Sequence, residues 1–168
     1  MLPTDVETAF NFYKDVDRIL PYLPRIEHVQ THAPSHLRVC YLSRELNAYD
    51  VRIFCDIQAE TDPENHVIRL LPQETSDPVK ASSGFHTTIA HGRYSSESYF
   101  YPEGDQTRLE YWIELAAELP KPWAVRLVPD SVMSSIATSI ATYRIQEIAN
   151  GFIERSAAAM VTWQEERL

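Results

Sequence analysis

The chain has 168 residues, of which 44% are hydrophobic and 23% charged, a composition typical of a folded globular protein rather than a disordered or fibrous one. The length fits one domain, which we expect to span residues 1–168. A formal net charge of −9 argues against a phosphate-binding basic surface, so no nucleic-acid partner is expected.

The sequence carries no signal for membrane insertion, metal binding or nucleotide binding. It has neither a run of roughly 18 apolar residues nor a signal peptide, so the expected location is cytoplasmic. The two cysteines, Cys40 and Cys55, form no CxxC, and the histidines form no HxH or HExxH. His86 and His91 lie five residues apart, which places them on opposite faces of a strand. With no Walker A or GxGxxG motif either, we expect no metal and no cofactor.

Two short helices are expected at the start of the chain. Thr4 and Glu7 have the spacing of a capping box, which predicts a helix beginning at Thr4. Asp15 or Asp17 is expected to cap a second short helix that ends near Pro24.

Four strands are then predicted from alternating apolar residues, over residues 26–31, 37–46, 51–60 and 66–71. A two-residue turn at Asn47 and Ala48 would place Cys40 opposite Cys55. A three-residue turn would instead bury one face of the second strand, consisting of Val39, Tyr41 and Ser43. The sequence leaves both registers open, and the polar residues 72–84 that follow the fourth strand are predicted to form a loop.

Residues 87–119 predict a long hairpin whose inner face has unusually small or polar residues. A two-residue loop at Glu103 and Gly104 would pair Phe100 with Thr107 and Tyr94 with Ile113. The inner face would then carry Ala90, Gly92, Tyr94, Ser96, Ser98 and Tyr111. Such a face is compatible with a very close helix approach or with a cavity that has a few polar anchors, and we favour the cavity.

An apolar connection and a long helix follow the hairpin. Within residues 120–129, Trp123 and Leu127 are expected either to seal the end of the helix or to form a lid or membrane-touching lip at a pocket mouth. Asp130 is expected to cap the helix, which continues to about residue 163. Arg144 and Glu147 belong to a face that is expected to be solvated.

Two stripes of residues follow the helical repeat. The first, expected to lie along the sheet over an incompletely filled space, consists of Ser134, Thr138, Ala141, Ile145, Ile148 and Phe152. The second could be covered by the N-terminal helices, by a second copy of the chain or by a membrane, and consists of Val132, Ile136, Ile140 and Tyr143. Gly151 is expected to mark a close approach to a neighbouring segment.

These elements make an α+β chain with two layers. The opening PTDVETAFNFYKDVDRILPYLPRIEHV and the ending LPKPWAVRLVPDSVMSSIATSIATYRIQEIANGFIERS resemble the START-like, or SRPBCC, superfamily of helix-grip proteins, which includes polyketide cyclases and lipid-transfer domains. The ending also resembles the uncharacterised DUF1997-like branch. The resemblance implies a curved antiparallel sheet of about six strands wrapped around the C-terminal helix. The superfamily usually has a strand before the first helix, where only Met1 to Pro3 precede Thr4 here.

The resemblance also implies binding or transport of a hydrophobic small molecule, such as a lipid, quinone, isoprenoid or pigment, between sheet and helix. Trp123 and Leu127 would lie at the pocket mouth. The candidate ligand-binding residues are Tyr94, Ser96, Ser98, Tyr111, Ile113, Ser134, Thr138, Ala141 and Ile145.

Two alternatives to simple binding remain open. A cyclase or aromatase would use Tyr94 or Tyr111 to steer an enolate or donate a proton. A protein-interaction module would use the second helix stripe, and the chain would be a monomer or homodimer with a transient membrane contact. A tyrosine that faces a core is usually only packed there, so binding is preferred over catalysis.

Overall fold

The structure is a computed structural model that describes residues 1–45 and 49–166. The described helices are α1 (Val6–Tyr13), α2 (Val16–Ile19) and α3 (Asp130–Glu165), with 3-10 turns η1 (Leu20–Tyr22) and η2 (Trp123–Val125). The described strands are β1 (Ile26–Ala33), β2 (His36–Glu45), β3 (Tyr49–Asp62), β4 (Val67–Pro72), β5 (Ser82–Ser83), β6 (Thr87–Glu103) and β7 (Gln106–Ala117).

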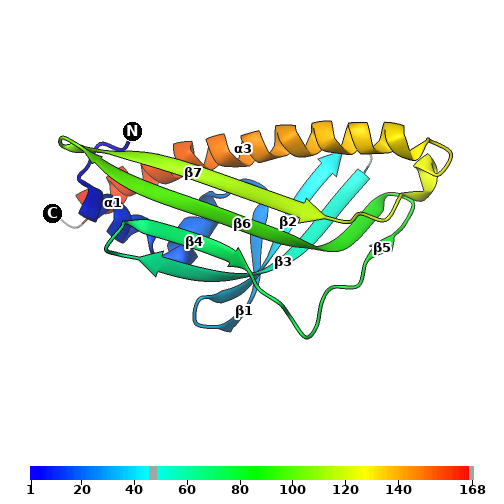
Figure 1. Ribbon diagram of the computed structural model, residues 1–168, viewed down its shortest axis with the longest axis horizontal. Coiled ribbons are helices and arrows are strands. Elements are labelled where there is room, and N and C mark those ends of the chain that lie inside the picture. The colour runs from blue at the N-terminus through cyan, green and yellow to red at the C-terminus, as the bar shows by residue number, and fades with distance from the viewer. Residues whose placement is uncertain (46–48, 167–168) are drawn as a thin grey trace.

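The strands form one curved sheet, with α3 along one side of it and α1 near one end (Figure 1). The order is β1-β2-β3-β4-β6-β5, and β7 pairs with β6. All pairings are antiparallel except one, in which the first part of β3 runs parallel to the start of β6. This arrangement confirms the expected α+β helix-grip architecture.

The register of the β2–β3 hairpin is the one expected from a three-residue turn. Glu45 pairs with Tyr49 and Cys40 pairs with Phe54, so the cysteines are not opposite each other. Val39, Tyr41 and Ser43 are buried, as that alternative predicts. The turn residues Asn47 and Ala48 lie outside the described residues.

The predicted register of the β6–β7 hairpin is wrong by two residues. Glu103 pairs with Gln106, so the two-residue loop consists of Gly104 and Asp105. Gly104 has a φ of 68°, and a hairpin loop with glycine first avoids the steric cost of that angle. Phe100 therefore pairs with Leu109 and Tyr94 with Leu115. A shift of two residues keeps every side chain on its predicted face.

Two of the three predicted helix caps need correction, and the third is confirmed. Asp5, not Thr4, caps α1, and its carboxylate accepts a hydrogen bond from the Thr8 amide at 3.0 Å. Asp15 caps α2, one of the two predicted candidates. Asp130 makes no capping bond and instead pairs with Lys121 at 2.9 Å. Leu2 forms a single-residue bridge to Thr107 on β7, so the residues before α1 contribute an isolated bridge to the sheet.

The hydrophobic core lies between the sheet and the second half of α3. Ile148, Phe152, Ser156 and Met160 are the buried residues of this helix. The Tyr13 hydroxyl lies 2.8 Å from the Ser156 hydroxyl, which donates to the Phe152 carbonyl. Aromatic rings from α1, β6 and α3 pack around this bond, including Phe10, Phe12, Tyr13, Phe100 and Phe152. The N-terminal helices therefore cover the end of α3, not its beginning.

The first half of α3 has no comparable cover. Val132, Ile136 and Tyr143 are exposed and Ile140 is half-buried, so the expectation that the N-terminal helices pack on this second stripe is wrong. The helix is continuous from Asp130 to Glu165, with a rise of about 1.5 Å per residue. It is therefore longer than the core, which packs only on its second half.

Two glycines allow close approaches that position these layers. At Gly151 a Cβ atom would lie 2.6 Å from Pro24 Cγ, which confirms the expected close approach of α3 to the chain before β1. At Gly92 a Cβ atom would lie 2.5 Å from Ile53 Cγ2 and 2.8 Å from the Ala116 carbonyl oxygen. Gly92 thus lets β6 pass closely between β3 and β7.

We expect Gly92→Ala to lower the free energy of unfolding by about 2 kcal/mol, because the added methyl group overfills this position. Urea denaturation monitored by circular dichroism would measure the change. Gly84→Ala is the matched control, since the nearest atom to its Cβ would be the Thr87 carbonyl oxygen at 3.8 Å. Equal unfolding midpoints for the two variants would contradict the packing argument.

Candidate functional site

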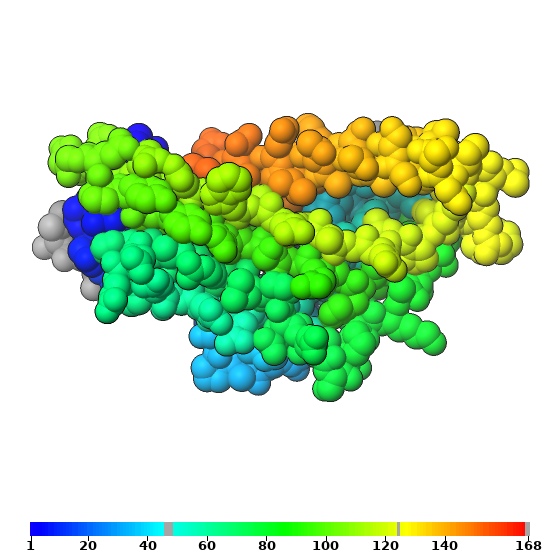
Figure 2. All heavy atoms as spheres, viewed as in Figure 1, coloured from blue at the N-terminus to red at the C-terminus, as the bar shows by residue number. Residues whose placement is uncertain are grey.

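The first half of α3 stands away from the sheet and leaves a hollow between them. Figure 2 shows this hollow between the yellow-to-orange helix α3 and the yellow-green strand β7, with β2 and β3 visible behind it. We use the name sheet–helix hollow for this space, which residues 130–145 of α3 border on one side and the inner faces of β6 and β7 on the other.

We call the inward-facing alternate residues of two paired strands, β6 and β7, the floor of the sheet–helix hollow. On β6 the inward side chains Tyr94, Ser96 and Ser98 are buried. Ser96 pairs with Ile113 and Ser98 with Tyr111, both of which are half-buried on β7. The structure therefore brings together all five strand residues that the sequence predicted for ligand binding.

Tyr94 and Tyr111 form the main polar feature of this floor. Their hydroxyl oxygens lie 2.9 Å apart. Burial raises the pKa of both phenols, so each keeps its proton at neutral pH. One hydroxyl donates to the other, and the second proton is left to donate to a third group, such as the neighbouring Ser96 or the oxygen of a bound molecule.

The helix side of the hollow is open. Ser134, Thr138 and Ala141 continue the stripe that carries the buried Ile148 and Phe152, yet all three are exposed, while Ile145 is half-buried. The hollow ends where the Tyr111 ring meets Phe152, with ring centroids 5.0 Å apart. The predicted helix residues thus lie on the side of α3 that turns towards the sheet, but the sheet does not cover them.

Two polar groups on the inner face were missed by the sequence analysis. Thr88 is 2% exposed, and neither its hydroxyl nor that of Tyr49 has a hydrogen-bond partner among the described residues. A buried hydroxyl without a partner costs roughly 1–3 kcal/mol, so both are suited to an oxygen-bearing ligand. The alternation that marks Ala90 and Gly92 as inward also marks Thr88. Tyr49 lies beside a turn whose register the sequence left open.

A cluster of ion pairs fixes α3 at the inner end of the hollow. Arg144 donates two hydrogen bonds to Glu45 at the end of β2, at 2.9 and 3.1 Å, and one to Glu147 at 2.6 Å. Arg25 donates two more to Glu147, both at 3.0 Å. We call these four residues the Arg144 clamp.

The Arg144 clamp overturns the prediction that Arg144 and Glu147 lie on a solvated face. Hydrogen bonds from Arg25 hold the pKa of Glu147 below its usual value. Burial opposes ionisation of Glu45, but hydrogen bonds from Arg144 outweigh it and lower its pKa. Both carboxylates therefore stay charged and keep the helix at a fixed distance from β2.

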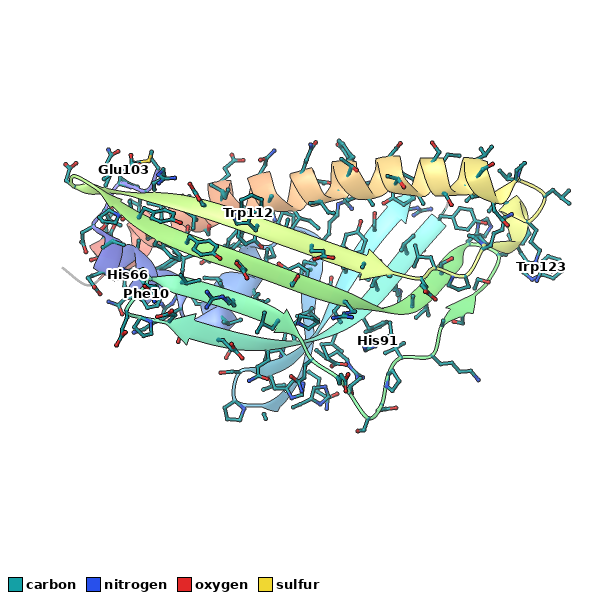
Figure 3. The ribbon with its side chains drawn as sticks, in the orientation of Figure 1. Phe10, His66, His91, Glu103, Trp112 and Trp123 are labelled. Atoms are coloured by element: carbon teal, nitrogen blue, oxygen red, sulfur yellow. The ribbon has the colours of Figure 1, made fainter. Side chains whose placement is uncertain are left out.

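The apolar segment before α3 lies at the other end of the hollow. Trp123 is 60% exposed and Leu127 is 100% exposed. The expectation that these side chains seal the start of the helix is therefore wrong, because neither is packed. The expectation of a lip at the mouth of the hollow is compatible with the position of Trp123 at this end of the molecule (Figure 3).

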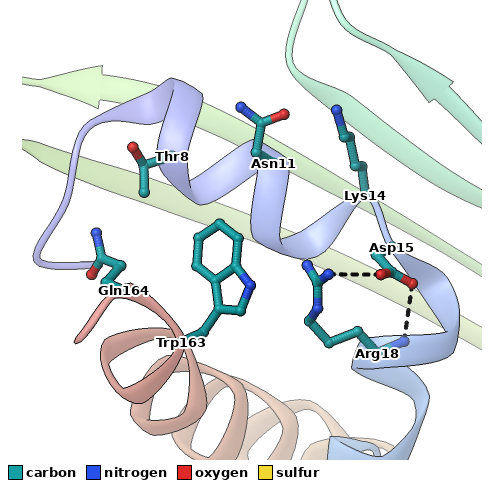
Figure 4. Close-up of a pocket in the computed structure, with 7 residues that line it drawn as sticks. All are labelled: Thr8, Asn11, Lys14, Asp15, Arg18, Trp163 and Gln164. Atoms are coloured by element: carbon teal, nitrogen blue, oxygen red, sulfur yellow. Dashed lines mark hydrogen bonds and ion pairs between the residues drawn. The ribbon is translucent and has the colours of Figure 1, made fainter. Parts of the chain in front are cut away.

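A second recess lies at the far end of the molecule, between α1 and the end of α3 (Figure 4). This groove has a volume of about 730 Å³ and is lined by Thr8, Asn11, Lys14, Asp15, Arg18, Trp163 and Gln164. The Arg18 guanidinium pairs with Asp15 at 2.8 Å and lies 5.3 Å from the Trp163 ring. None of the residues predicted for ligand binding lies in this polar groove.

A buried charge pair occupies the face of the sheet opposite α3. Asp56, whose side chain is fully buried, accepts two hydrogen bonds from Arg38, each at 2.9 Å. His32 lies 3.2 Å and His91 3.6 Å from the same carboxylate. Burial opposes ionisation of Asp56, but the hydrogen bonds from Arg38 outweigh it, so its pKa lies below the usual value.

The same pair holds the loop that follows β4. Arg38 also donates to the Asp77 carbonyl at 2.8 Å, and the Val79 amide donates to His91 Nδ1 at 3.3 Å. These contacts satisfy the polar groups of the cluster within the fold. We therefore assign the Asp56 cluster a structural role.

Across residues 1–45 and 49–166, no three His, Cys, Asp or Glu side chains are placed to hold a metal ion. Within the same residues, no helix is both long enough and apolar enough to span a bilayer.

Comparison with known proteins gives matches in structure alone. No family model and no curated protein matches the sequence. TTHA0849 from Thermus thermophilus is 20% identical, with a TM-score of 0.53 over 94% of this chain and 93% of that one. The di-domain ARO/CYC StfQ from the steffimycin biosynthetic pathway is 11% identical, with a TM-score of 0.52 over 94% of this chain and 47% of that one.

Human STARD10 has the same architecture, with 8% identity and a TM-score of 0.51 over 98% of this chain and 63% of that one. Identities this low establish a shared fold and not a shared activity. The chain therefore has the START-like helix-grip fold, as its sequence indicates.

We expect Asp56→Asn to lower the free energy of unfolding at pH 7 by about 3 kcal/mol, because Arg38 would stay buried without its carboxylate partner. The folded-state pKa of Asp56 is below the ordinary 3.8, so its stabilising effect is complete above that pH and is lost as the pH falls through the folded value. Urea denaturation over a range of pH should show the two proteins converging only below about pH 4.

Asp50→Asn is the control for this measurement, since Asp50 is exposed on the same strand. A similar loss of stability in both variants would contradict a specific role for the buried pair.

Proposed function

We propose that this protein binds a hydrophobic small molecule in the sheet–helix hollow and acts as its carrier or sensor. The observation that carries the proposal is the unpacked first half of α3, which lies beside a sheet face of small and hydroxylated side chains with a hollow between α3 and β7 (Figure 2). The helix residues that face this space are small, so they leave room for a bound molecule, and the partly apolar space is stabilised when an apolar molecule displaces water from it.

The polar groups of the hollow narrow the class of ligand. The Tyr94 and Tyr111 hydroxyls share one hydrogen bond, and the second proton of the pair can go to Ser96 or to a ligand oxygen. The unpartnered Thr88 hydroxyl lies on the same strand as Tyr94, nearer the mouth. No charged side chain occurs among the candidate lining residues. A molecule that is largely hydrocarbon, with one or two carbonyl or hydroxyl oxygens, fits this arrangement better than an ionic one. Lipids, quinones, isoprenoids and pigments with such groups belong to this class.

The structural comparisons support the proposal at the level of the fold. The similarity to StfQ, an ARO/CYC protein of a biosynthetic pathway, also makes a cyclase the second candidate. The observation that favours it is the Tyr94–Tyr111 pair in the hollow. Because the pKa of each phenol is raised, this pair would serve as a proton donor to a developing enolate rather than as a base.

The first experiment is native mass spectrometry of the purified protein, followed by solvent extraction and mass analysis of any released molecule. We expect an apolar adduct with a stoichiometry near one. A bare-chain mass, together with no uptake of added fatty-acid, quinone and isoprenoid probes, would overturn the proposal.

Filling the hollow should remove binding. We expect Ser96→Leu combined with Thr138→Leu to reduce uptake of the extracted ligand at least tenfold, because the added side chains occupy the space on both walls. Fluorescence titration or native mass spectrometry would measure the loss. Ser95→Leu is the matched control, since Ser95 is next along β6 and lies on the opposite face. Equal uptake by both proteins would place the ligand elsewhere.

Replacing the hydroxyl pair should separate the two candidate functions. If Tyr111 or Tyr94 only binds a ligand oxygen, the Tyr→Phe variants should bind roughly three- to tenfold more weakly, as expected for the loss of one hydrogen bond. A cyclase would instead keep its affinity for a polyketide and lose turnover. Tyr143→Phe is the control, because Tyr143 is 62% exposed.

A further inference from the structure

The mouth of the sheet–helix hollow carries a cluster of exposed apolar side chains. Leu127 and Trp123 protrude from the segment before α3, and Leu119 precedes them on the same segment. Phe85 is 64% exposed on the turn before β6, and Val132 and Ile136 extend the cluster along the first turns of α3. We call these six residues the apolar lip.

The two segments of the apolar lip are joined in the structure. The Ser83 hydroxyl donates to the Lys121 carbonyl at 3.5 Å, which ties the strand before Phe85 to the segment that bears Leu119 and Trp123. Trp123 lies at the opposite end of the molecule from Phe10 and His66 (Figure 3). The segment that bears Trp123 thus lies at one end of the protein, next to the opening of the hollow.

Few charged side chains lie near the apolar lip, and the two basic ones, Lys121 and Arg126, contact neighbouring residues. No charged residue occurs from Ser131 to Tyr143, although the whole chain has a net charge of −9. Lys121 is turned towards the protein, where its ammonium group contacts Asp130 and the Val128 carbonyl. Arg126 lies with its guanidinium 4.3 Å from the centre of the Trp123 ring. One cation stacked on an indole therefore lies among the apolar groups.

We propose that the apolar lip docks on the surface of a lipid bilayer, with Leu127 in the acyl region and Trp123 at the headgroup level. Tryptophan prefers the interface between hydrocarbon and water, and a neighbouring arginine can pair with a lipid phosphate. A fully exposed leucine at the end of a loop suits insertion into a fluid layer.

This docking would bring the mouth of the hollow against the bilayer, so an apolar ligand could pass between them without crossing water. The docking itself does not depend on what the hollow binds. Because the driving force is apolar insertion and the protein is acidic, docking should require no anionic lipid and should change little with salt.

The test is co-sedimentation with vesicles of pure phosphatidylcholine and with vesicles that contain about a fifth phosphatidylglycerol, at low and at high salt. We expect the unaltered protein to bind both, and Leu127→Asp and Trp123→Ala each to weaken binding at least tenfold. Trp112→Ala is the matched control, because Trp112 is 67% exposed on β7 outside the apolar lip. Brominated lipids should quench the fluorescence of Trp123 and not that of Trp112.

Three outcomes would overturn the docking proposal. These are an absence of binding to either vesicle, equal binding by Leu127→Asp and the unaltered protein, and a dimer in light scattering that Leu127→Asp converts to monomer. The last would assign the apolar lip to a second copy. Circular dichroism of each variant would show that the fold is retained, and ligand uptake in the absence of vesicles tests the hollow separately.

Discussion

Helix α3 is longer than the core that holds it, and the other features of this protein depend on that difference. The helix runs from Asp130 to Glu165, but its four buried residues, Ile148, Phe152, Ser156 and Met160, all belong to its second half. Helices in water are held mainly by packing of an apolar face, so the second half anchors the whole element. The first half extends beyond the aromatic core as a continuous rod. A hollow beneath it follows, because the side chains that its first half turns towards the sheet, Ser134, Thr138 and Ala141, are small.

The hollow stays open for three separate physical reasons. Gly92 lets β6 bend closely against β3 and β7, which fixes the curvature of the floor. Ala90, Ser96 and Ser98 place little volume on that floor. The Arg144 clamp holds the helix to β2 by paired hydrogen bonds where the core ends. If Glu45 were apolar, α3 could settle onto the sheet. Because Arg144 and Glu45 are paired instead, the lengths of their side chains set the separation between α3 and β2.

The sequence predicted the faces of the strands better than their registers. Alternation in β6 and β7 identified Tyr94, Ser96 and Tyr111 as inward, and an error of two residues in the loop left those faces unchanged. That error arose because two loops of equal length compete around Gly104, and only its positive φ decides between them. The Arg144 clamp was not predictable, since Arg144 and Glu45 lie 99 positions apart in the sequence. In addition, Glu45 belongs to a hairpin whose register the sequence left open. The sequence left the exposure of Trp123 and Leu127 open for a related reason: an apolar segment is buried only where a partner exists, and the partner depends on the tertiary fold.

The distribution of polar groups connects the two ends of the molecule. At the anchored end, hydroxyl and charged groups are satisfied within the fold, as the Tyr13–Ser156 and Arg18–Asp15 contacts show. Towards the open end, Thr88 and Tyr49 have no partner among the described residues, and the apolar side chains there have no cover. Both deficits are unfavourable in water and are removed by the same kind of partner, one that is mostly hydrocarbon with a few oxygen atoms. An apolar ligand inside the hollow and a lipid surface at its mouth have this chemistry in common. The end of the protein that is least stabilised by its own contacts is therefore the end best suited to bind both.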